Sequence, residues 1–266
     1  MVLSSGAGTA KFEIRGATKT YEAKTGPVHA LQDVSFEVTA GELVCIVGPS
    51  GCGKTTLLWA MSGLHALTRG EILLDGSPVT GPRPAEIGMM FQDANLLPWR
   101  NLRKNIEFPF EIRKQPGSGE RIETLLREVG LDGFESSYPR ELSGGMQQRA
   151  SIVRALAPDP GVLLMDEPFG ALDAFTRDEM NLLLMRLWSE TRKTIVFVTH
   201  NISEAIFLAD RVVVMTPRPG RLARIFNIEL PRPRTVDMTF EPDFIELILE
   251  ITRVVEFGGS QTAEVK

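Results

Sequence analysis

The 266-residue sequence contains only two cysteines, Cys45 and Cys52. Cys45 lies in an apolar run and Cys52 in a glycine-rich loop, so the two thiols provide no disulfide framework. This usage is typical of a protein in a reducing cytoplasm. The chain is long enough to bury a substantial core, and we expect one large domain or two closely joined ones.

Long apolar segments are also absent. No run approaches the roughly 18–20 apolar residues that a bilayer-spanning helix needs. Residues 1–10 are small and polar, without the charged-then-apolar order of a signal peptide. We therefore expect the chain to stay in the compartment where it is made and to act at a membrane only through a partner.

The sequence lacks an excess of positive charge. Its 29 Lys and Arg residues are outnumbered by 34 Asp and Glu residues, which gives a formal net charge of -5. A general nucleic-acid-binding protein requires a basic field along the phosphates, so we expect no nucleic-acid partner, although a local basic patch is compatible with this balance.

Hydrophobic patterns predict an α/β protein with a mostly parallel sheet. Residues 12–14 and 34–38 alternate as half-exposed strands do, whereas residues 43–47 form a continuous apolar run typical of a strand buried on both faces. Further strands are predicted at residues 71–74, 87–91, 162–166, 194–199 and 212–215. Helices are predicted at residues 54–64, 122–129, 144–157, 179–191, 202–209 and 243–255. Strands that alternate with helices of this length favour parallel pairing.

A glycine-rich loop follows the apolar run at residues 43–47. Its sequence, Gly48-Pro49-Ser50-Gly51-Cys52-Gly53-Lys54-Thr55, matches the phosphate-binding pattern GxxxxGK[ST]. Backbone N–H groups of such a loop surround phosphate oxygens, and the following helix N-terminus adds positive potential. We expect Lys54 to reach the β- and γ-phosphates of ATP, Thr55 to ligate Mg²⁺, and Thr56 to border the nucleotide. The alternative, a glycine-rich turn that only starts a helix, fits the strand–loop–helix context less well.

Two carboxylates end the apolar run at residues 162–165. Asp166 and Glu167 would emerge at the crevice where open α/β sheets bind ligands. We expect Asp166 to hold Mg²⁺ and Glu167 to polarise the attacking water. The alternative is a pair of solvated carboxylates, which the upstream phosphate loop disfavours.

The segment Leu142-Ser143-Gly144-Gly145-Met146-Gln147-Gln148-Arg149 separates this chain from other P-loop ATPases. Ser143 is a good N-cap, and the paired glycines open the first turn of a helix, which creates a second anion site. The segment resembles the LSGGQ-type motif of ABC (ATP-binding-cassette) ATPases, with Met146 where glutamine is commonest. The resemblance implies that this site serves the ATP of a second copy, so that two ATPs are enclosed in a two-fold dimer.

Other motifs of that family match in order over residues 11–230. Tyr21 matches the aromatic that stacks on adenine, with a hairpin-surface tyrosine as the alternative. Gln92 matches the glutamine that senses Mg²⁺ and the γ-phosphate, and His200 the switch histidine that contacts the γ-phosphate. The loop Ala171-Leu172-Asp173 matches the segment that contacts the other copy. His29 and His65 receive no functional role.

The resemblance also implies the domain organisation and fold class. A P-loop NTPase core with a mostly parallel sheet would comprise residues 11–95 and 159–230 and include an antiparallel β subdomain. Residues 96–158 would form a helical insertion subdomain that carries the signature motif. Residues 231–266 would be a C-terminal extension, in which 231–235 look like a linker into the last amphipathic helix.

The segment Asp93-Ala94-Asn95-Leu96-Leu97-Pro98-Trp99-Arg100 resembles importer ATPases for nitrate, sulfonates, taurine and related small anions. Residues 215–221 and 228–233 are similar to the same group. Exposed apolar residues here would form a groove for a helix of a membrane subunit. The alternative is that Leu96, Leu97 and Trp99 pack inside the helical insertion.

The resemblance predicts an ATPase subunit of an ABC importer at the cytoplasmic face of the membrane. Its partners would be a second copy of itself, membrane-spanning permease subunits and, indirectly, a solute-binding protein. One alternative is a soluble ABC ATPase that acts on DNA or ribosomes, but no heptad run separates Lys54 from Ser143 and only one cassette is present. The other alternative is an ABC transporter ATPase for an unrelated substrate. A non-catalytic scaffold is disfavoured because the expected catalytic residues Lys54, Glu167 and His200 are all retained.

Overall fold

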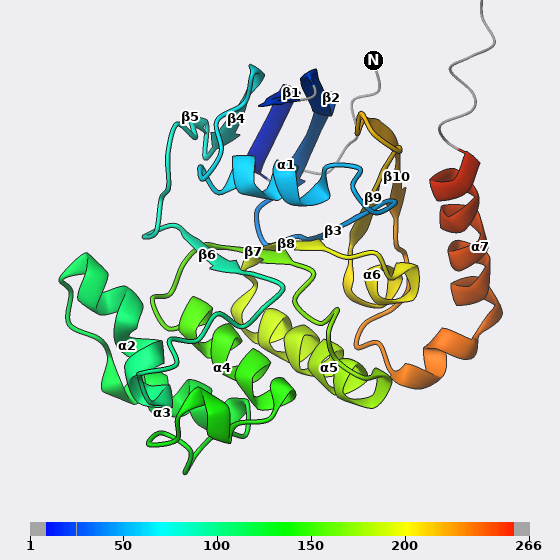
Figure 1. The fold of residues 1–266 in the computed structure, drawn as a ribbon. Coiled ribbons are helices and arrows are strands. Elements are labelled where there is room, and N and C mark those ends of the chain that lie inside the picture. Colours follow the sequence, from blue (N-terminus) through cyan, green and yellow to red (C-terminus); the bar gives the residue numbers. More distant parts are fainter. Residues whose placement is uncertain (1–8, 25, 258–266) are drawn as a thin grey trace, which may run out of the picture.

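The computed structural model describes residues 9–24 and 26–257. Its centre is a six-stranded sheet in the order β10-β9-β3-β8-β7-β6 (Figure 1). Five of the strands pair in parallel, and β10 pairs with β9 in the antiparallel direction. Their bounds are β3 Leu43–Val47, β6 Ile87–Met90, β7 Val162–Asp166, β8 Thr194–Val198, β9 Arg211–Met215 and β10 Leu222–Asn227. The predicted α/β class and the mostly parallel sheet are confirmed; β10 was not predicted.

A second, antiparallel sheet has the order β2-β1-β4-β5. Its strands are β1 Ala10–Ala23, β2 Gly26–Thr39, β4 Arg69–Leu74 and β5 Ser77–Pro78. Helix α1, Lys54–Met61, lies between the two sheets (Figure 1). Leu57 and Met61 on α1 share one buried cluster with Phe12 of β1 and Ile46 of β3. The inner faces of both sheets therefore fix the helix that begins at the phosphate loop.

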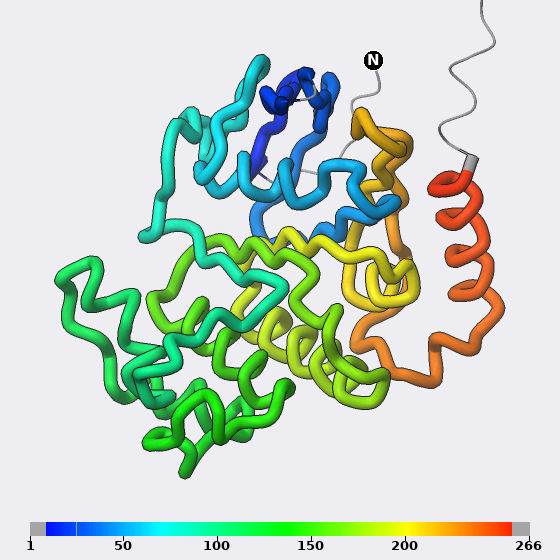
Figure 2. Tube along the Cα trace, viewed as in Figure 1, coloured from blue at the N-terminus to red at the C-terminus, as the bar shows by residue number. Residues whose placement is uncertain are grey.

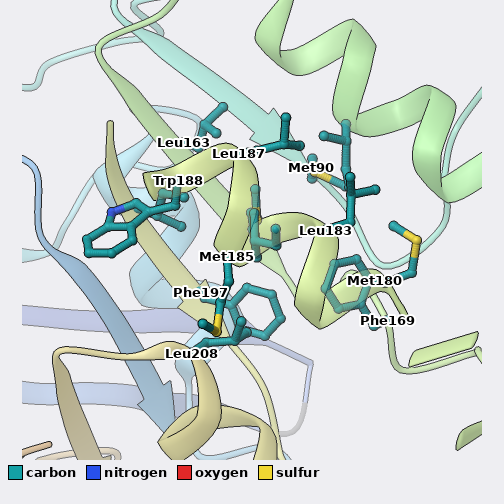
Figure 3. Close-up of a cluster of buried hydrophobic side chains, with 14 of the residues drawn as sticks. Met90, Leu163, Phe169, Met180, Leu183, Met185, Leu187, Trp188, Phe197 and Leu208 are labelled. Atoms are coloured by element: carbon teal, nitrogen blue, oxygen red, sulfur yellow. The ribbon is translucent and has the colours of Figure 1, made fainter. Parts of the chain in front are cut away.

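The other face of the six-stranded sheet is covered by helices α4 Gly144–Leu156, α5 Ala174–Thr191 and α6 Ile202–Leu208 (Figure 1). Side chains of α5 pack with those of the strands, as Figure 3 shows for Leu183, Leu187 and Phe197. The strands β3, β7 and β8 are buried along their whole length because both of their faces are covered. Helix α5 begins at Ala174, earlier than predicted, because the Asp173 carboxylate accepts a hydrogen bond from the Thr176 amide.

The predicted helical insertion is present between β6 and β7. It contains α2 Leu102–Arg113, α3 Gly119–Glu128, the 3-10 turn η1 Pro139–Glu141 and α4. Helix α2 was not identified from the sequence, and it contains Pro109. The fully buried Asn105 amide on α2 bonds the backbone of Leu97, Arg100 and Asn101. This contact fixes the loop that joins the sheet to the helices.

The chain after β10 passes close to the core before helix α7. Residues 231–235 have no helix or strand, as a linker would, and they lead through η2 Val236–Phe240 into α7 Pro242–Phe257. The segment is packed, however, because Arg234 is only 2% exposed. Its guanidinium donates to the carbonyls of Ile206, Phe207 and Ala209 at the end of α6 and of Ile228 and Leu230 after β10. Figure 2 traces this segment and the final helix beside the core.

Replacing Arg234 with Met should lower the free energy of unfolding by about 3 kcal/mol, because buried carbonyls would lose their donors. Chemical denaturation followed by circular dichroism measures this value. Arg253→Met, at an exposed position of α7, is the matched control and should change stability by less than about 0.5 kcal/mol. Equal stability of the two variants would show that the guanidinium does not anchor the segment.

Helix α7 rests on the core through Phe244 and Ile251, both fully buried. The described part of the extension therefore packs against the core and stabilises it. Residues 258–266, the rest of the predicted extension, lie outside the described residues, and so do residues 1–8. No helix in the described ranges combines the length and apolar character that a membrane span requires.

Candidate functional site

The glycine-rich loop leaves the buried end of β3 and enters α1 at Lys54. Gly53 adopts φ 105°, and a Cβ there would lie 2.7 Å from the Ala30 carbonyl oxygen, so only glycine fits. Lys54 is 5% exposed, and its ammonium donates to the carbonyls of Gly48 at 2.9 Å and Pro49 at 3.1 Å. The loop thus wraps around its own lysine at the carboxyl edge of the parallel sheet.

The structure brings Thr55 and Asp166 together, as the sequence motifs predicted. The Thr55 hydroxyl donates to Asp166 Oδ1 at 2.9 Å. Burial at the end of β7 raises the pKa of Asp166, and the hydrogen bond from Thr55 opposes that shift. Among the described residues no cationic side chain forms an ion pair with Asp166, although the charge of Lys54 acts on it, and a buried carboxylate in this setting is a favourable place for a cation. Its oxygen and the adjacent hydroxyl oxygen are the hard ligands that Mg²⁺ prefers, so these residues fit the ion.

Glu167 and His200 also lie side by side. Glu167 Oε2 and His200 Nδ1 are 3.0 Å apart, and the Glu167 amide donates to the Val198 carbonyl on the neighbouring strand. Glu167 has a left-handed backbone, with φ 44°, at the sharp turn after β7. This turn directs its carboxylate away from the sheet and toward the end of β8, where His200 follows.

A buried hydrogen-bond network next to His200 was not predicted from the sequence. The Thr199 hydroxyl donates to Glu204 Oε2 at 2.5 Å and accepts from the Asn201 amide at 3.0 Å. The Asn201 side chain in turn caps α6 by accepting from the Glu204 amide. Burial raises the pKa of Glu204. The Asn-x-x-Glu spacing of a helix start was the available sequence signal.

Gln92 follows β6 and lies beside Glu167. A Cβ built at Gly170 would sit 3.9 Å from Gln92 Nε2 and 3.8 Å from Glu167 Oε2, so both side chains border the same space. The Gln92 carbonyl accepts a 2.9 Å hydrogen bond from Gln148, which is buried in α4. This contact, which sequence reasoning missed, ties the Gln92 loop to the helix that begins at the signature motif.

The signature motif forms a separate hollow. Ser143 caps α4 by accepting from the Met146 amide at 3.3 Å, as predicted. The hollow, of about 380 Å³, is lined by the Ser143–Gly145 turn together with Ala171, Leu172 and Asp173. Hydrogen bonds from Thr176 lower the pKa of Asp173. No residue of the phosphate loop lines this hollow within the described part of the chain, so one chain does not bring the two anion sites together.

Tyr21 lies on the antiparallel sheet, near the β1–β2 hairpin. Its hydroxyl and His65 Nδ1 are 2.9 Å apart, and His65 packs edge-on against Trp59, with ring centroids 4.8 Å apart. The Lys19 ammonium lies 5.0 Å from the Tyr21 ring. His65 therefore supports Tyr21, a contact that the sequence did not indicate. Stacking of Tyr21 on adenine stays a prediction.

The loop before α2 presents an aromatic side chain to solvent. Trp99 is 71% exposed, whereas Leu96 packs against the core and Leu97 is partly buried. Asn105 holds the backbone of this loop through the contacts described above. The alternative of internal packing therefore describes Leu96 but not Trp99.

A glycine-rich loop at the carboxyl edge of a parallel sheet, facing an acidic strand end, defines a nucleotide site of the P-loop NTPase class. Comparison with known proteins narrows this class. The family model described as "ABC transporter" matches residues 31–170.

Relatives and solved structures agree with that match. An uncharacterised ABC transporter ATP-binding protein of Methanocaldococcus jannaschii is 48% identical over 84% of each chain. An aliphatic sulfonates import ATP-binding protein, SsuB of Bacillus cereus, is 41% identical over 92% of this chain and 96% of its own. The taurine import ATP-binding protein TauB of Roseobacter denitrificans is 44% identical over 93% and 90%. A dimeric ATP-binding cassette solved in a post-hydrolysis state with ADP and Pi superposes with a TM-score of 0.73 at 33% identity, over 83% of this chain and all of that one.

The chain belongs to the family of ABC transporter ATP-binding proteins, and it is an ATPase of the ABC type.

Proposed function

We propose that this chain is the ATP-hydrolysing subunit of an ABC importer for a small anion, with an organosulfonate such as taurine as the leading substrate class. The proposal depends most on one observation: Lys54, Thr55, Asp166, Glu167 and His200 meet at one edge of the sheet. The names of the sulfonate and taurine import relatives support the substrate class, and nitrate transport is the related possibility.

In the proposed mechanism the loop Gly48–Gly53 holds the phosphates of ATP through backbone N–H groups. Lys54 leaves its loop carbonyls to contact the β- and γ-phosphates, and Thr56 borders the nucleotide. Thr55, Asp166 and Gln92 would hold Mg²⁺, which when bound neutralises charge on the phosphate oxygens. Tyr21 would stack on the adenine.

Glu167 is the proposed general base. Its carboxylate accepts the proton of the attacking water, and His200 orients that carboxylate through the 3.0 Å contact while it faces the γ-phosphate. The hydrogen bond between Thr199 and Glu204 holds the backbone next to His200 in place. Gln92 lies beside Glu167, and its backbone carbonyl accepts a hydrogen bond from Gln148 on α4. A movement of Gln92 when the γ-phosphate binds would therefore be transmitted to α4 through this hydrogen bond.

Two copies would complete each active site. The Ser143–Gly145 turn lies in its own hollow, and in a two-fold dimer it would face the ATP on the phosphate loop of the other copy. Asp173, which lines the same hollow, would contact that copy. The dimeric ADP- and Pi-bound cassette, which is similar over its whole length, supports this arrangement.

These positions assign a proposed role to each part of the chain. Residues 11–95 and 159–230 would form the ATP-binding core, residues 96–158 the helical subdomain with the signature, and residues 231–266 the extension. The exposed Trp99 on its fixed loop would contact a permease helix, and the chain would then lie peripherally at the cytoplasmic face of the membrane. A solute-binding protein would deliver the anion to the permease.

Replacing Leu97 and Trp99 with Asp should abolish co-purification with the permease, because two carboxylates would enter an apolar contact. ATP affinity should stay within about two-fold, since the phosphate loop, Lys54 and Thr55 are unchanged. Leu249→Asp, at an exposed position of α7, is the matched control and should co-purify normally. Normal co-purification of the double variant would show that the permease docks elsewhere.

The proposed function is tested in proteoliposomes that contain the chain, its permease and its binding protein. Taurine or a short alkanesulfonate outside the vesicle should accumulate only when MgATP is enclosed with the chain. Uptake that is equal without ATP, or ATP-driven uptake of unrelated solutes only, would contradict the proposal.

A further inference from the structure

An arginine-rich cavity of about 470 Å³ lies where α5 ends and residues 232–234 pass over it. Its wall includes Arg186, Trp188, Ser189, Arg192, Arg232 and Arg234, and no acidic side chain is among the described residues that line it. The Trp188 indole donates to the Gly41 carbonyl at 3.2 Å, just before β3 begins. The phosphate loop follows the other end of β3, so this cavity is at the opposite edge of the sheet from the nucleotide site.

The Trp188 ring is flanked by two guanidinium groups. Arg192 lies 4.7 Å and Arg232 4.2 Å from its ring centroid. Figure 3 shows the indole pointing away from the other labelled side chains of the buried cluster. A guanidinium stacked on an aromatic ring can still donate hydrogen bonds through its in-plane N–H groups. Arg232 already donates to Leu208 and Asp210, whereas the Arg192 guanidinium makes no hydrogen bond among the described residues. Trp188 is only 3% exposed, so the apolar part of the wall comes mainly from Leu182, which is 41% exposed and lines the cavity together with Met185.

The positive charge at this cavity is only partly compensated. Arg232 Nη2 pairs with Asp210 at 2.9 Å, but its Nη1 is buried with no partner among the described residues. Arg234 bonds only backbone carbonyls, and its Nε is likewise buried without a partner there. Burial, and then the charge of Arg232, lowers the pKa of Arg234 to about 10. The C-terminus of α5 adds only about half a negative charge, so an anion would complete the charge balance.

We propose that this cavity binds a small organic anion with a sulfonate, sulfate or phosphate head group and a short apolar body. Guanidinium forks match such tetrahedral oxygen acceptors, and the exposed Leu182 side chain offers apolar contact to the remainder. The volume falls in the range of small-molecule sites. An imported organosulfonate, which rests on the proposed function, and a phosphorylated metabolite are the two sources of this chemistry.

Isothermal titration of the full-length protein with propane-1-sulfonate, taurine, sulfate and inorganic phosphate tests the proposal. Arg186→Gln with Arg192→Asn removes two exposed charges, and Asn tolerates the left-handed backbone of residue 192, where φ is 49°. Ser189→Glu adds a carboxylate to the wall at an exposed position. Both variants should weaken binding by about ten-fold or more, because charge-assisted hydrogen bonds are lost or opposed. Arg69→Gln, an exposed arginine on β4, should bind as wild type does.

Saturable binding of any of these anions with that pattern of variants supports the cavity. Binding of phosphate or sulfate without either sulfonate supports the head-group site and excludes the organosulfonate, so that the phosphorylated metabolite is its source, whatever solute the proteoliposomes accumulate. The proposal is overturned if no probe binds saturably, or if Arg186→Gln with Arg192→Asn binds every probe as tightly as wild type does.

Discussion

Replacing Glu167 with Gln is expected to lower ATP turnover by about 10²- to 10⁴-fold, the usual contribution of a general base. Gln has nearly the same size and retains a partner for His200, but its amide cannot accept the proton of the attacking water. Lys54 and Thr55 are unchanged, so ATP affinity should stay near wild type. The variant should therefore accumulate as a closed dimer with ATP bound, measured by light scattering alongside phosphate release.

Glu190→Gln is the matched control for this experiment, because Glu190 is an exposed carboxylate near the end of α5. It should hydrolyse ATP at the wild-type rate and remain monomeric or dimeric as wild type does. If Glu167→Gln hydrolyses ATP as fast as Glu190→Gln does, Glu167 is not the general base.

Gly144→Asp is expected to lower turnover by about 10²-fold or more, because its carboxylate would oppose the phosphate at a preorganised anion site. A Cβ at Gly144 meets no atom within 4 Å, so the side chain fits. Asp is also favourable in the first turn of a helix, and α4 should keep its stability. ATP binding to the isolated chain should be unchanged, since the phosphate loop lies outside the signature hollow. Steady-state phosphate release and equilibrium nucleotide binding measure the two effects.

Gly81→Asp provides the matched control, because a Cβ at Gly81 also meets no atom within 4 Å and Gly81 lies in the loop between β5 and β6, outside the phosphate loop and the signature turn. This variant should retain turnover. If Gly144→Asp also turns over normally, the signature hollow takes no part in the reaction.

Local patterns were sufficient to predict the nucleotide edge of the sheet. The apolar run before Gly48 and the one before Asp166 each specify a buried strand, and a buried strand determines where its last residue emerges. Short-range signals also specified the caps: Ser143 at the start of α4 is visible from its own spacing. The contact between Glu167 and His200 then follows from parallel pairing of the adjacent strands β7 and β8. Thr55 and Asp166 meet because β3 and β7 both pair in parallel with β8, which lies between them.

The parts that could not be predicted depend on contacts between distant segments. Arg234 lies in a proline-rich stretch that reads as a linker, and its guanidinium is buried because it meets the carbonyls at the end of α6 and those of Ile228 and Leu230 after β10. Gln148 donates to the backbone carbonyl of Gln92, 56 positions away, and no periodic pattern in the sequence predicts this contact. Helix α2 contains Pro109 and was missed because proline normally ends a helix. The support of Tyr21 by His65 likewise joins two separate elements.

The central claim is that each active site combines the phosphate loop of one copy with the signature turn of another. It is tested most directly by mixing two chains that both carry Glu167→Gln, one with Lys54→Ala and the other with Gly144→Asp, and measuring their mass by light scattering with ATP. The mixture is predicted to form dimers, because one of its two composite sites keeps an intact Lys54 and an intact Gly144, whereas neither chain alone should dimerise. A mixture that stays monomeric while Glu167→Gln by itself dimerises with ATP would contradict the composite site.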